Sequence, residues 1–268
     1  MFILNTQLIN FYTMPFTISH AVLAPPISKL TGHRLPISAL AIGCMVPDLV
    51  RLFTSEDIHS THLWSAWLYP NLLIGLGFCL LWYLIFRPAC FRFVGIHKPI
   101  KIGAFRNMIQ FILCVIFALL IGTSTHLIWD GLTHVDFRTF AFKDFLSQNI
   151  SLFNQTYPMH RILQIGTSVI ALPILMIMTK HYYQQHRQSK LVSQKIKFYG
   201  FSLFIISIFA GLFGYISFAQ PLGPQPWQND LYWFIGKSIN HFFSAFLIAF
   251  GLGCLIFQFF DHRGFFDL

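Results

Sequence analysis

Long apolar segments separated by short polar connections dominate the chain. Each segment approaches or exceeds the roughly 20 residues that an α-helix needs to cross the hydrocarbon core of a bilayer. The segments are Leu63–Phe86, Phe105–Ile128, Ile162–Met178, Phe198–Phe218 and Leu231–Phe260. Two shorter apolar stretches, Ser19–Leu30 and Pro36–Phe53, precede them and are broken by Pro25-Pro26 and Pro47-Asp48. The pattern predicts an all-α polytopic integral membrane helix bundle of about five long transmembrane helices. The two shorter N-terminal helices are expected to pack inside the bundle or to be partly re-entrant.

Composition strengthens this prediction. The chain is 55% apolar and only 10% charged, unlike an ordinary soluble domain. Its five cysteines are scattered without a Cys-x-x-Cys pair, which argues against a disulfide framework or a cysteine zinc site. No repeat or soluble-domain linker interrupts the pattern, and the start lacks the basic region and apolar core of a cleavable signal. We expect one membrane-embedded domain.

The basic residues predict the orientation of the bundle. They collect in two connections, with Arg87, Arg92, Lys98, Lys101 and Arg106 in one and Lys180, Arg187, Lys190, Lys195 and Lys197 in or beside the other. The positive-inside rule makes both connections cytoplasmic, and the Gln220–Asp230 connection, which has no Lys or Arg, non-cytoplasmic. The net charge of +9 therefore indicates topology and contact with anionic membrane lipids, with no nucleic-acid partner. We expect a multi-pass protein of a cell membrane, specifically a bacterial inner membrane.

One stretch points to chemistry. His126, Asp130 and His134 stand four residues apart at the end of an apolar run. In a helix each follows the last by one turn plus about 40°, so the three side chains share one face. Ionisable groups near lipid are costly and are usually kept for function. Histidine nitrogen and carboxylate oxygen suit zinc and similar divalent metals, so the spacing predicts a metal site.

Other polar residues are expected at the same level. A helix from Phe105 to His134 would be about 45 Å long and would emerge at the non-cytoplasmic interface. Alternating helix directions bring further candidate groups to that side: His20, Asp48, His59, His62 and His160. The candidates outnumber one tetrahedral shell, which allows two or three ions, or one ion with hydrogen-bonded partners. Lys237 or Arg161 could receive an anionic group.

Simpler interpretations stay open for single residues. Asp48 after Pro47 could cap a helix, and the turn from His59 to His62 could be solvated. A lone histidine at a membrane interface is more often a hydrogen-bonding residue than a metal ligand.

Several motifs resemble the membrane family catalogued as domain of unknown function 4184. They are Met14-Pro15-Phe16-Thr17-Ile18-Ser19-His20-Ala21, Ala41-Ile42-Gly43-Cys44-Met45-Val46-Pro47-Asp48, the stretch from Thr125 to His134, and Ile162-Leu163-Gln164-Ile165-Gly166-Thr167-Ser168. The resemblance covers residues 14 to about 173. Because the family pattern begins at Met14, it implies a membrane-embedded domain over residues 14–268, with residues 1–13 as an extension or the result of a misplaced start. That family has no settled activity, so the likeness implies a membrane fold without naming a reaction.

The order of ligand types is similar to a second group. Ser-His, Pro-Asp, a His-rich turn and His-x-x-x-Asp occur in this order in YdjM-like membrane-bound metal-dependent hydrolases and in the zinc-dependent phospholipase C superfamily. The resemblance implies these metal ligands: His20, Asp48, one of His59 or His62, His126 and Asp130. His134 and His160 are looser matches. The superfamily ends on His-x-x-x-Glu, whereas this chain has Gln164 after His160, and it has no evident counterpart of the phospholipases' metal-binding N-terminal amine.

These observations lead to one functional hypothesis and two alternatives. The hypothesis is a membrane-bound hydrolase, dependent on a divalent metal for which zinc is expected, that cleaves a phosphoester in a lipid or lipid-linked substrate at the outer membrane interface. His134 or His160 would move a proton, and Lys237 or Arg161 would bind the phosphate. The first alternative is a transporter or metal-handling membrane protein, and the second is a structural membrane subunit without catalysis.

Overall fold

The computed structural model describes residues 17–54, 58–100, 102–152, 155–188, 192–225 and 231–266. The expected extension over residues 1–13 lies outside the described residues. Among these described residues, five helical stretches are long and apolar enough to cross a membrane: Asn71–Val94, Phe105–Thr133, Met159–His186, Gln194–Leu222 and Trp233–His262. This confirms the predicted all-α membrane class and the number of long helices.

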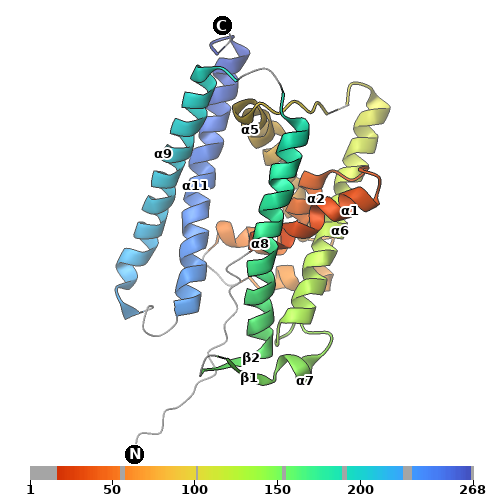
Figure 1. Ribbon diagram of the computed structural model, residues 1–268, viewed down its shortest axis with the longest axis vertical. Helices are drawn as coiled ribbons and strands as arrows, with labels where there is room; N and C mark the ends of the chain where they lie inside the picture. The colour runs from red at the N-terminus through yellow and green to blue at the C-terminus, as the bar shows by residue number, and fades with distance from the viewer. Residues whose placement is uncertain are drawn as a thin grey trace, which may run out of the picture.

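The long helices form the frame of the molecule (Figure 1). The first span is made of α4 (Asn71–Leu81), the π-helical turn η5 (Trp82–Phe86) and α5 (Arg87–Val94). The others are α6 (Phe105–Thr133), α8 (Met159–His186), α9 (Gln194–Ala219) with η6 (Gln220–Leu222), and α11 (Leu231–His262). α9 and α11 run side by side as an antiparallel pair, with α8 between this pair and α6 in the view of Figure 1.

Short elements fill the space beside α6. They are η1 (Thr17–Leu23), α1 (Ala24–Leu30), α2 (Ile37–Gly43), α3 (Val46–Leu49), η2 (Val50–Leu52), η3 (Ser60–His62) and η4 (Trp64–Ala66). One apolar cluster joins α1, α2, α3, α4 and α6 through buried residues such as Leu40, Val46 and Leu119. A second cluster joins α5, α9 and α11 around Ile196 and Phe257. The two N-terminal helical stretches thus pack within the bundle.

Two local differences from the predicted elements concern connections. The first span begins at Asn71 instead of near Leu63, because η3 and η4 wind the intervening residues into short turns. After α6, the chain forms α7 (Lys143–Leu146) and a hairpin of β1 (Asn149–Leu152) and β2 (Gln155–Pro158). These strands lie in a polar connection, where no apolar pattern revealed them.

The two basic connections meet at one end of the bundle. The Gln188 amide donates to the Gly95 carbonyl at 2.8 Å, and Ile96 forms a β-bridge with Arg187. α6 starts at this end and carries its last turns to the opposite end (Figure 1). The two basic connections therefore lie on the same side, as charge counting predicted, and the end of α6 lies away from them.

The backbones of α2 and α6 are in contact at two glycines. A methyl group on Gly122 would lie 2.5 Å from the Leu40 carbonyl oxygen and 2.7 Å from the Cys44 amide nitrogen. A methyl group on Gly43 would lie 2.6 Å from the carbonyl oxygen of Leu119. Only residues without a side chain allow this approach, as in other tightly packed membrane helices. The contact brings the end of α2 against the last turns of α6.

Candidate metal centre

Five predicted ligands come together at the end of α6. His20 comes from η1, Asp48 from α3, His62 from η3, and His126 and Asp130 from α6. All five are buried, and His126 and Asp130 have no exposed surface. Two triads bring metal-binding atoms within 4.8 Å of one another, His20 with His126 and Asp130, and Asp48 with His62 and His126. Both triads contain His126, so the two candidate ligand sets share its imidazole.

The hydrogen bonds of His126 define the state of its ring. Its Nδ1 lies 2.8 Å from the carbonyl oxygen of Cys44, at the end of α2. A carbonyl can only accept, so Nδ1 carries a proton, and the neutral ring keeps a lone pair on Nε2. This Nε2 is buried and has no hydrogen-bond partner among the described residues. A histidine oriented by a carbonyl through its other nitrogen is the usual arrangement of a metal ligand.

His62 has the same arrangement. The Thr61 hydroxyl donates to the Pro47 carbonyl at 2.8 Å, so it can only accept from His62 Nδ1, 3.3 Å away. The neutral His62 ring therefore also keeps its lone pair on Nε2, which lies 3.1 Å from the Asp48 Oδ1 atom. A lone pair directed at a carboxylate oxygen is repulsive unless a cation or an added proton lies between them.

The spacing of these atoms suits a small cation. His126 Nε2 lies 3.5 Å from Asp130 Oδ2 and 3.9 Å from Asp48 Oδ2, and His62 Nε2 lies 3.7 Å from Asp130 Oδ2. Ligand atoms around a tetrahedral zinc ion with bonds of about 2.0–2.1 Å are separated by about 3.3 Å. Asp130 Oδ1, which is buried, also has no hydrogen-bond partner among the described residues. The donor set thus fits zinc or a similar divalent ion.

Burial keeps the outer histidines neutral. Desolvation, followed by repulsion from His126, lowers the pKa of His20 to about 3. Desolvation also lowers the pKa of His62, and it lowers the pKa of His134 to about 4, although nearby carboxylates act in the opposite direction. Neutral imidazole is the form that binds metal. For Asp48, burial acts to raise the pKa, but Arg51 and the contacts with His62 and His126 outweigh it and hold the pKa below its usual range.

Asp48 is oriented toward the cluster instead of capping a helix. α3 has Met45 as its N-cap and has no side-chain capping bond. The Asp48 carboxylate accepts from the Thr17 hydroxyl at 3.0 Å and pairs with Arg51 at 2.8 Å, besides its contact with His62. The capping alternative for Asp48 and the solvated turn for His62 therefore do not describe these two residues.

Other predicted site residues lie outside the two triads. His134 is closest to them: it is buried, and its Nδ1 bonds the Asp130 carbonyl oxygen at 3.1 Å and lies 3.8 Å from Asp130 Oδ1. His59 is half-buried with its ring against Phe137, and half-buried His160 lies 3.3 Å from the Leu146 carbonyl. Gln164 donates to the Thr133 carbonyl at 2.8 Å, so it ties α8 to the end of α6.

The two predicted anion-binding cations are also outside the triads. Lys237 is buried on α11, and Arg161 is half-buried near the start of α8. Neither belongs to the two triads, so their role in binding an anion stays a prediction.

Two arginines that the sequence analysis did not select contact the ligand carboxylates. Arg51 pairs with Asp48, and Arg138 donates to Asp130 Oδ2 at 3.1 Å. Arg138 is buried and also binds both carboxylate oxygens of Asp136. The spacing of Asp48 and Arg51 within one helical turn is visible in the sequence. The Arg138 contact requires the chain after α6 to fold back, which no local pattern indicates.

The returning segment after α6 packs closely on Gly131. The Phe140 amide donates to the Gly131 carbonyl at 3.3 Å, and a methyl on Gly131 would lie 2.1 Å from the Phe140 ring. The Thr139 hydroxyl donates to the His134 carbonyl at 2.6 Å. These contacts place Arg138 beside Asp130. Three carboxylates then face two guanidinium groups, and with neutral histidines the cluster keeps one negative charge for a cation to neutralise.

Comparison with known proteins identifies a family and no function. No curated protein and no solved structure matches the chain. A family model described as a domain of unknown function, DUF4184, matches residues 14–256. The match begins at Met14, as the motifs indicated, and extends well past the expected limit near residue 173. The chain therefore belongs to the DUF4184 family.

Proposed function

We propose that this protein is a membrane-bound, metal-dependent hydrolase that cleaves a phosphoester in a lipid or lipid-linked substrate. The supporting observation is the pair of imidazole lone pairs, on His126 Nε2 and His62 Nε2, that face the carboxylates of Asp48 and Asp130 in a buried site. Such a set needs a cation or an added proton between nitrogen and oxygen, and its nitrogen and oxygen donors suit zinc. A bound divalent ion would supply Lewis-acid chemistry for a phosphoryl oxygen and lower the pKa of water.

The chain's own residues then have distinct roles. His20, Asp48, His62, His126 and Asp130 hold the ion. His134 borders Asp130 through its Nδ1 atom, so we favour it over His160 as the group that moves a proton. Arg51 and Arg138 touch the ligand carboxylates, so we assign phosphate binding to them before Lys237 or Arg161.

Beside the cluster lies a small crevice whose apolar surroundings favour a lipid substrate. It is lined by η1, α6 and α8 through Ser19, His20, Val22, Leu23, Trp129, Thr167 and Ala171, and its volume is about 10 Å³, close to that of one water molecule. The neighbouring surface is apolar, because Ile18, Val169 and Ile170 are 49%, 57% and 63% exposed. A substrate that reaches His20 from this side would travel within the membrane.

We also propose that the site faces the non-cytoplasmic side of a bacterial inner membrane. The two basic connections lie together at the other end of the bundle, and the positive-inside rule places them in the cytoplasm. A cysteine at Pro224 should react with an impermeant thiol reagent in intact cells, whereas one at Arg187 should not. The reverse labelling would invert this topology.

Metal analysis and hydrolysis by the purified protein test the proposed function. Gently purified protein should contain at least one zinc or similar divalent ion per chain. It should release phosphate or a phosphorylated head group from some member of a panel of phospholipids and isoprenoid phosphates. Chelation should abolish the release, and zinc should restore it.

Other results of these two assays would favour one of the alternative functions. Bound metal without hydrolysis of any panel member would favour a metal-handling protein or transporter. Along α6, however, the polar residues before Gly122 are Arg106, Asn107 and Gln110, all exposed near the opposite end, so no chain of ligands crosses the membrane there. Absence of metal from the purified protein would remove the basis for the hydrolase and favour a structural subunit.

A further inference from the structure

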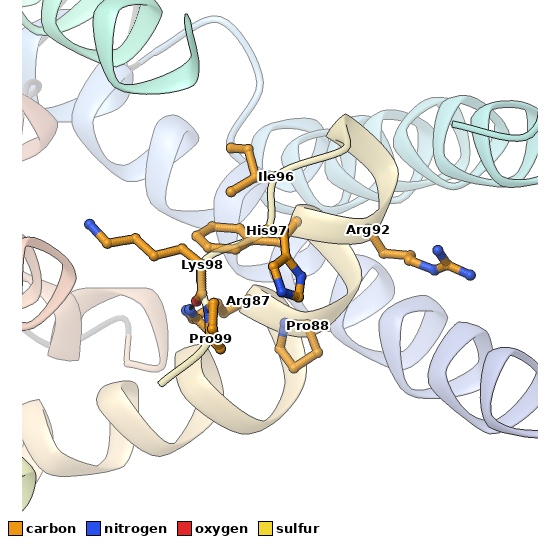
Figure 2. Close-up of a pocket in the computed structure, with 8 residues that line it drawn as sticks. Arg87, Pro88, Arg92, Ile96, His97, Lys98 and Pro99 are labelled. Carbon is orange, nitrogen blue, oxygen red and sulfur yellow. Dashed lines mark hydrogen bonds between the residues drawn. The ribbon is translucent and has the colours of Figure 1, made fainter. Parts of the chain in front are cut away.

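A basic pocket lies at the end of the bundle opposite the metal centre. Its volume is about 210 Å³, and it is lined by α5 and the segment that follows it, through Arg87, Pro88, Phe91, Arg92, Ile96, His97, Lys98 and Pro99. Figure 2 shows His97 and Arg87 beside Pro88 and Pro99, with the side chains of Lys98 and Arg92 reaching outward on either side. The pocket shares no residue with the metal centre.

The walls of this pocket are held by specific contacts. Gly95 ends α5 with a φ of 71°, a left-handed conformation that favours glycine. The Ile96 amide then bonds the Phe91 carbonyl at 2.8 Å, and Ile96 pairs with Arg187 at the end of α8. The Arg87 guanidinium donates to the Lys98 carbonyl, which links the two walls. The pocket is thus part of the folded structure and not a gap beside a loose connection.

The charges in the pocket are only partly neutralised. Arg92 pairs with Asp261 at 3.2 Å. Within the described part of the chain, neither Arg87 nor Lys98 has a carboxylate within ion-pair distance. The Lys98 amine lies 5.1 Å from the centre of the Tyr182 ring, and the Arg87 guanidinium lies 4.6 Å from that of Phe91. These two cations leave a site for an anion, and a guanidinium with an ammonium suits phosphate.

An apolar stripe leads along the membrane span to the pocket. Leu80 and Leu84 are 61% and 65% exposed, and Pro88, which lines the pocket, is also exposed. Their four-residue spacing places them on one face of the first span. A free phosphate ion would not contact this stripe. A phospholipid could cover the stripe with an acyl chain while its head group lies in the pocket.

We propose that the pocket binds the phosphate of an anionic phospholipid, whose acyl chain lies along Leu80 and Leu84. Clusters of Lys and Arg that follow a transmembrane helix at the cytoplasmic surface are suited to such head groups. The lipid binds at the end of the bundle away from the metal, so it is a bound structural lipid and not the substrate of the proposed hydrolysis.

Thermal unfolding of the whole protein in neutral detergent tests this site. Phosphatidylglycerol should raise the unfolding temperature in a concentration-dependent way, while phosphatidylcholine and inorganic phosphate should not. The variant with both Arg87→Gln and Lys98→Gln should bind phosphatidylglycerol at least about tenfold more weakly, because it lacks two charge-assisted contacts. Arg106→Gln is the control, since it removes one charge from an exposed position in the first turn of α6, outside the pocket.

A second variant tests the pocket even if the double variant does not fold. His97→Trp leaves both cations in place and fills the pocket at an exposed position, and it should also weaken the response to phosphatidylglycerol. An unchanged response in both pocket variants would overturn the proposal. An equal effect of phosphatidylcholine would remove the role of charge, and an equal effect of inorganic phosphate would show a free-anion site in place of a lipid site.

Discussion

An Asp130→Asn protein should lose its bound metal and more than about 100-fold of its hydrolytic turnover while it still inserts and folds. The carboxylate lies in the fully buried cluster, 3.5 Å from His126 Nε2, and its Oδ1 has no hydrogen-bond partner among the described residues. Asparagine keeps the size of the side chain but removes the charge that attracts a cation. Loss of a ligand should exceed the about 10–100-fold that loss of an outer hydrogen-bond partner of a metal ligand costs.

Elemental analysis and turnover on the substrate found for the wild type measure this effect. Asp48→Asn should behave alike, and the double variant should be little worse than either single variant, because residues that act as a unit are not additive. Asp136→Asn is the matched control, since Asp136 contacts Arg138 but belongs to neither triad. Its loss should stay within about 100-fold. Wild-type metal content and turnover in both Asp130→Asn and Asp48→Asn would contradict the assignment of these aspartates as ligands.

An Arg138→Gln protein should be destabilised by about 3–5 kcal/mol, the cost of removing one partner from a buried ion pair. The guanidinium is buried and binds Asp130 and Asp136, so its loss leaves two carboxylates near one another without their shared cation. Added zinc should recover part of the stability, because the ion neutralises Asp130 but does not reach Asp136. Denaturant unfolding in detergent, with and without zinc, measures both effects.

Arg34→Gln provides the comparison for Arg138. It removes the same charge from an exposed arginine, so its free energy of unfolding should change by less than about 0.5 kcal/mol. If Arg138→Gln were as stable as this control, the fold-back of the chain onto Asp130 would be wrong. If it were destabilised but insensitive to zinc, Arg138 would support the fold without any link to the metal centre.

Local properties of the sequence were enough to predict the frame of the molecule and the centre of its site. A run of about 20 apolar residues must form its backbone hydrogen bonds internally within a membrane, so length and hydropathy alone predict the spanning helices. The shared face of His126 and Asp130 follows in the same way from helical geometry. Asp48 and His20 were correctly expected near this face, because alternating helix directions determine which end each segment reaches.

Only the tertiary structure decided which other groups complete the site. His62 contacts Asp48, whereas His59 packs against Phe137, although the two histidines stand three residues apart in the same turn. The tautomer of His126 depends on the Cys44 carbonyl, which the contact of α2 with α6 at Gly43 and Gly122 brings within 2.8 Å.

Arg138 reaches Asp130 because Phe140 packs on Gly131 and turns the chain back. Each of these contacts joins segments through side-chain packing and backbone approach. Hydropathy and helical period describe one segment at a time. The spans and the shared face of His126 and Asp130 could therefore be predicted from the sequence. The partners of these two residues could be identified only in the packed structure.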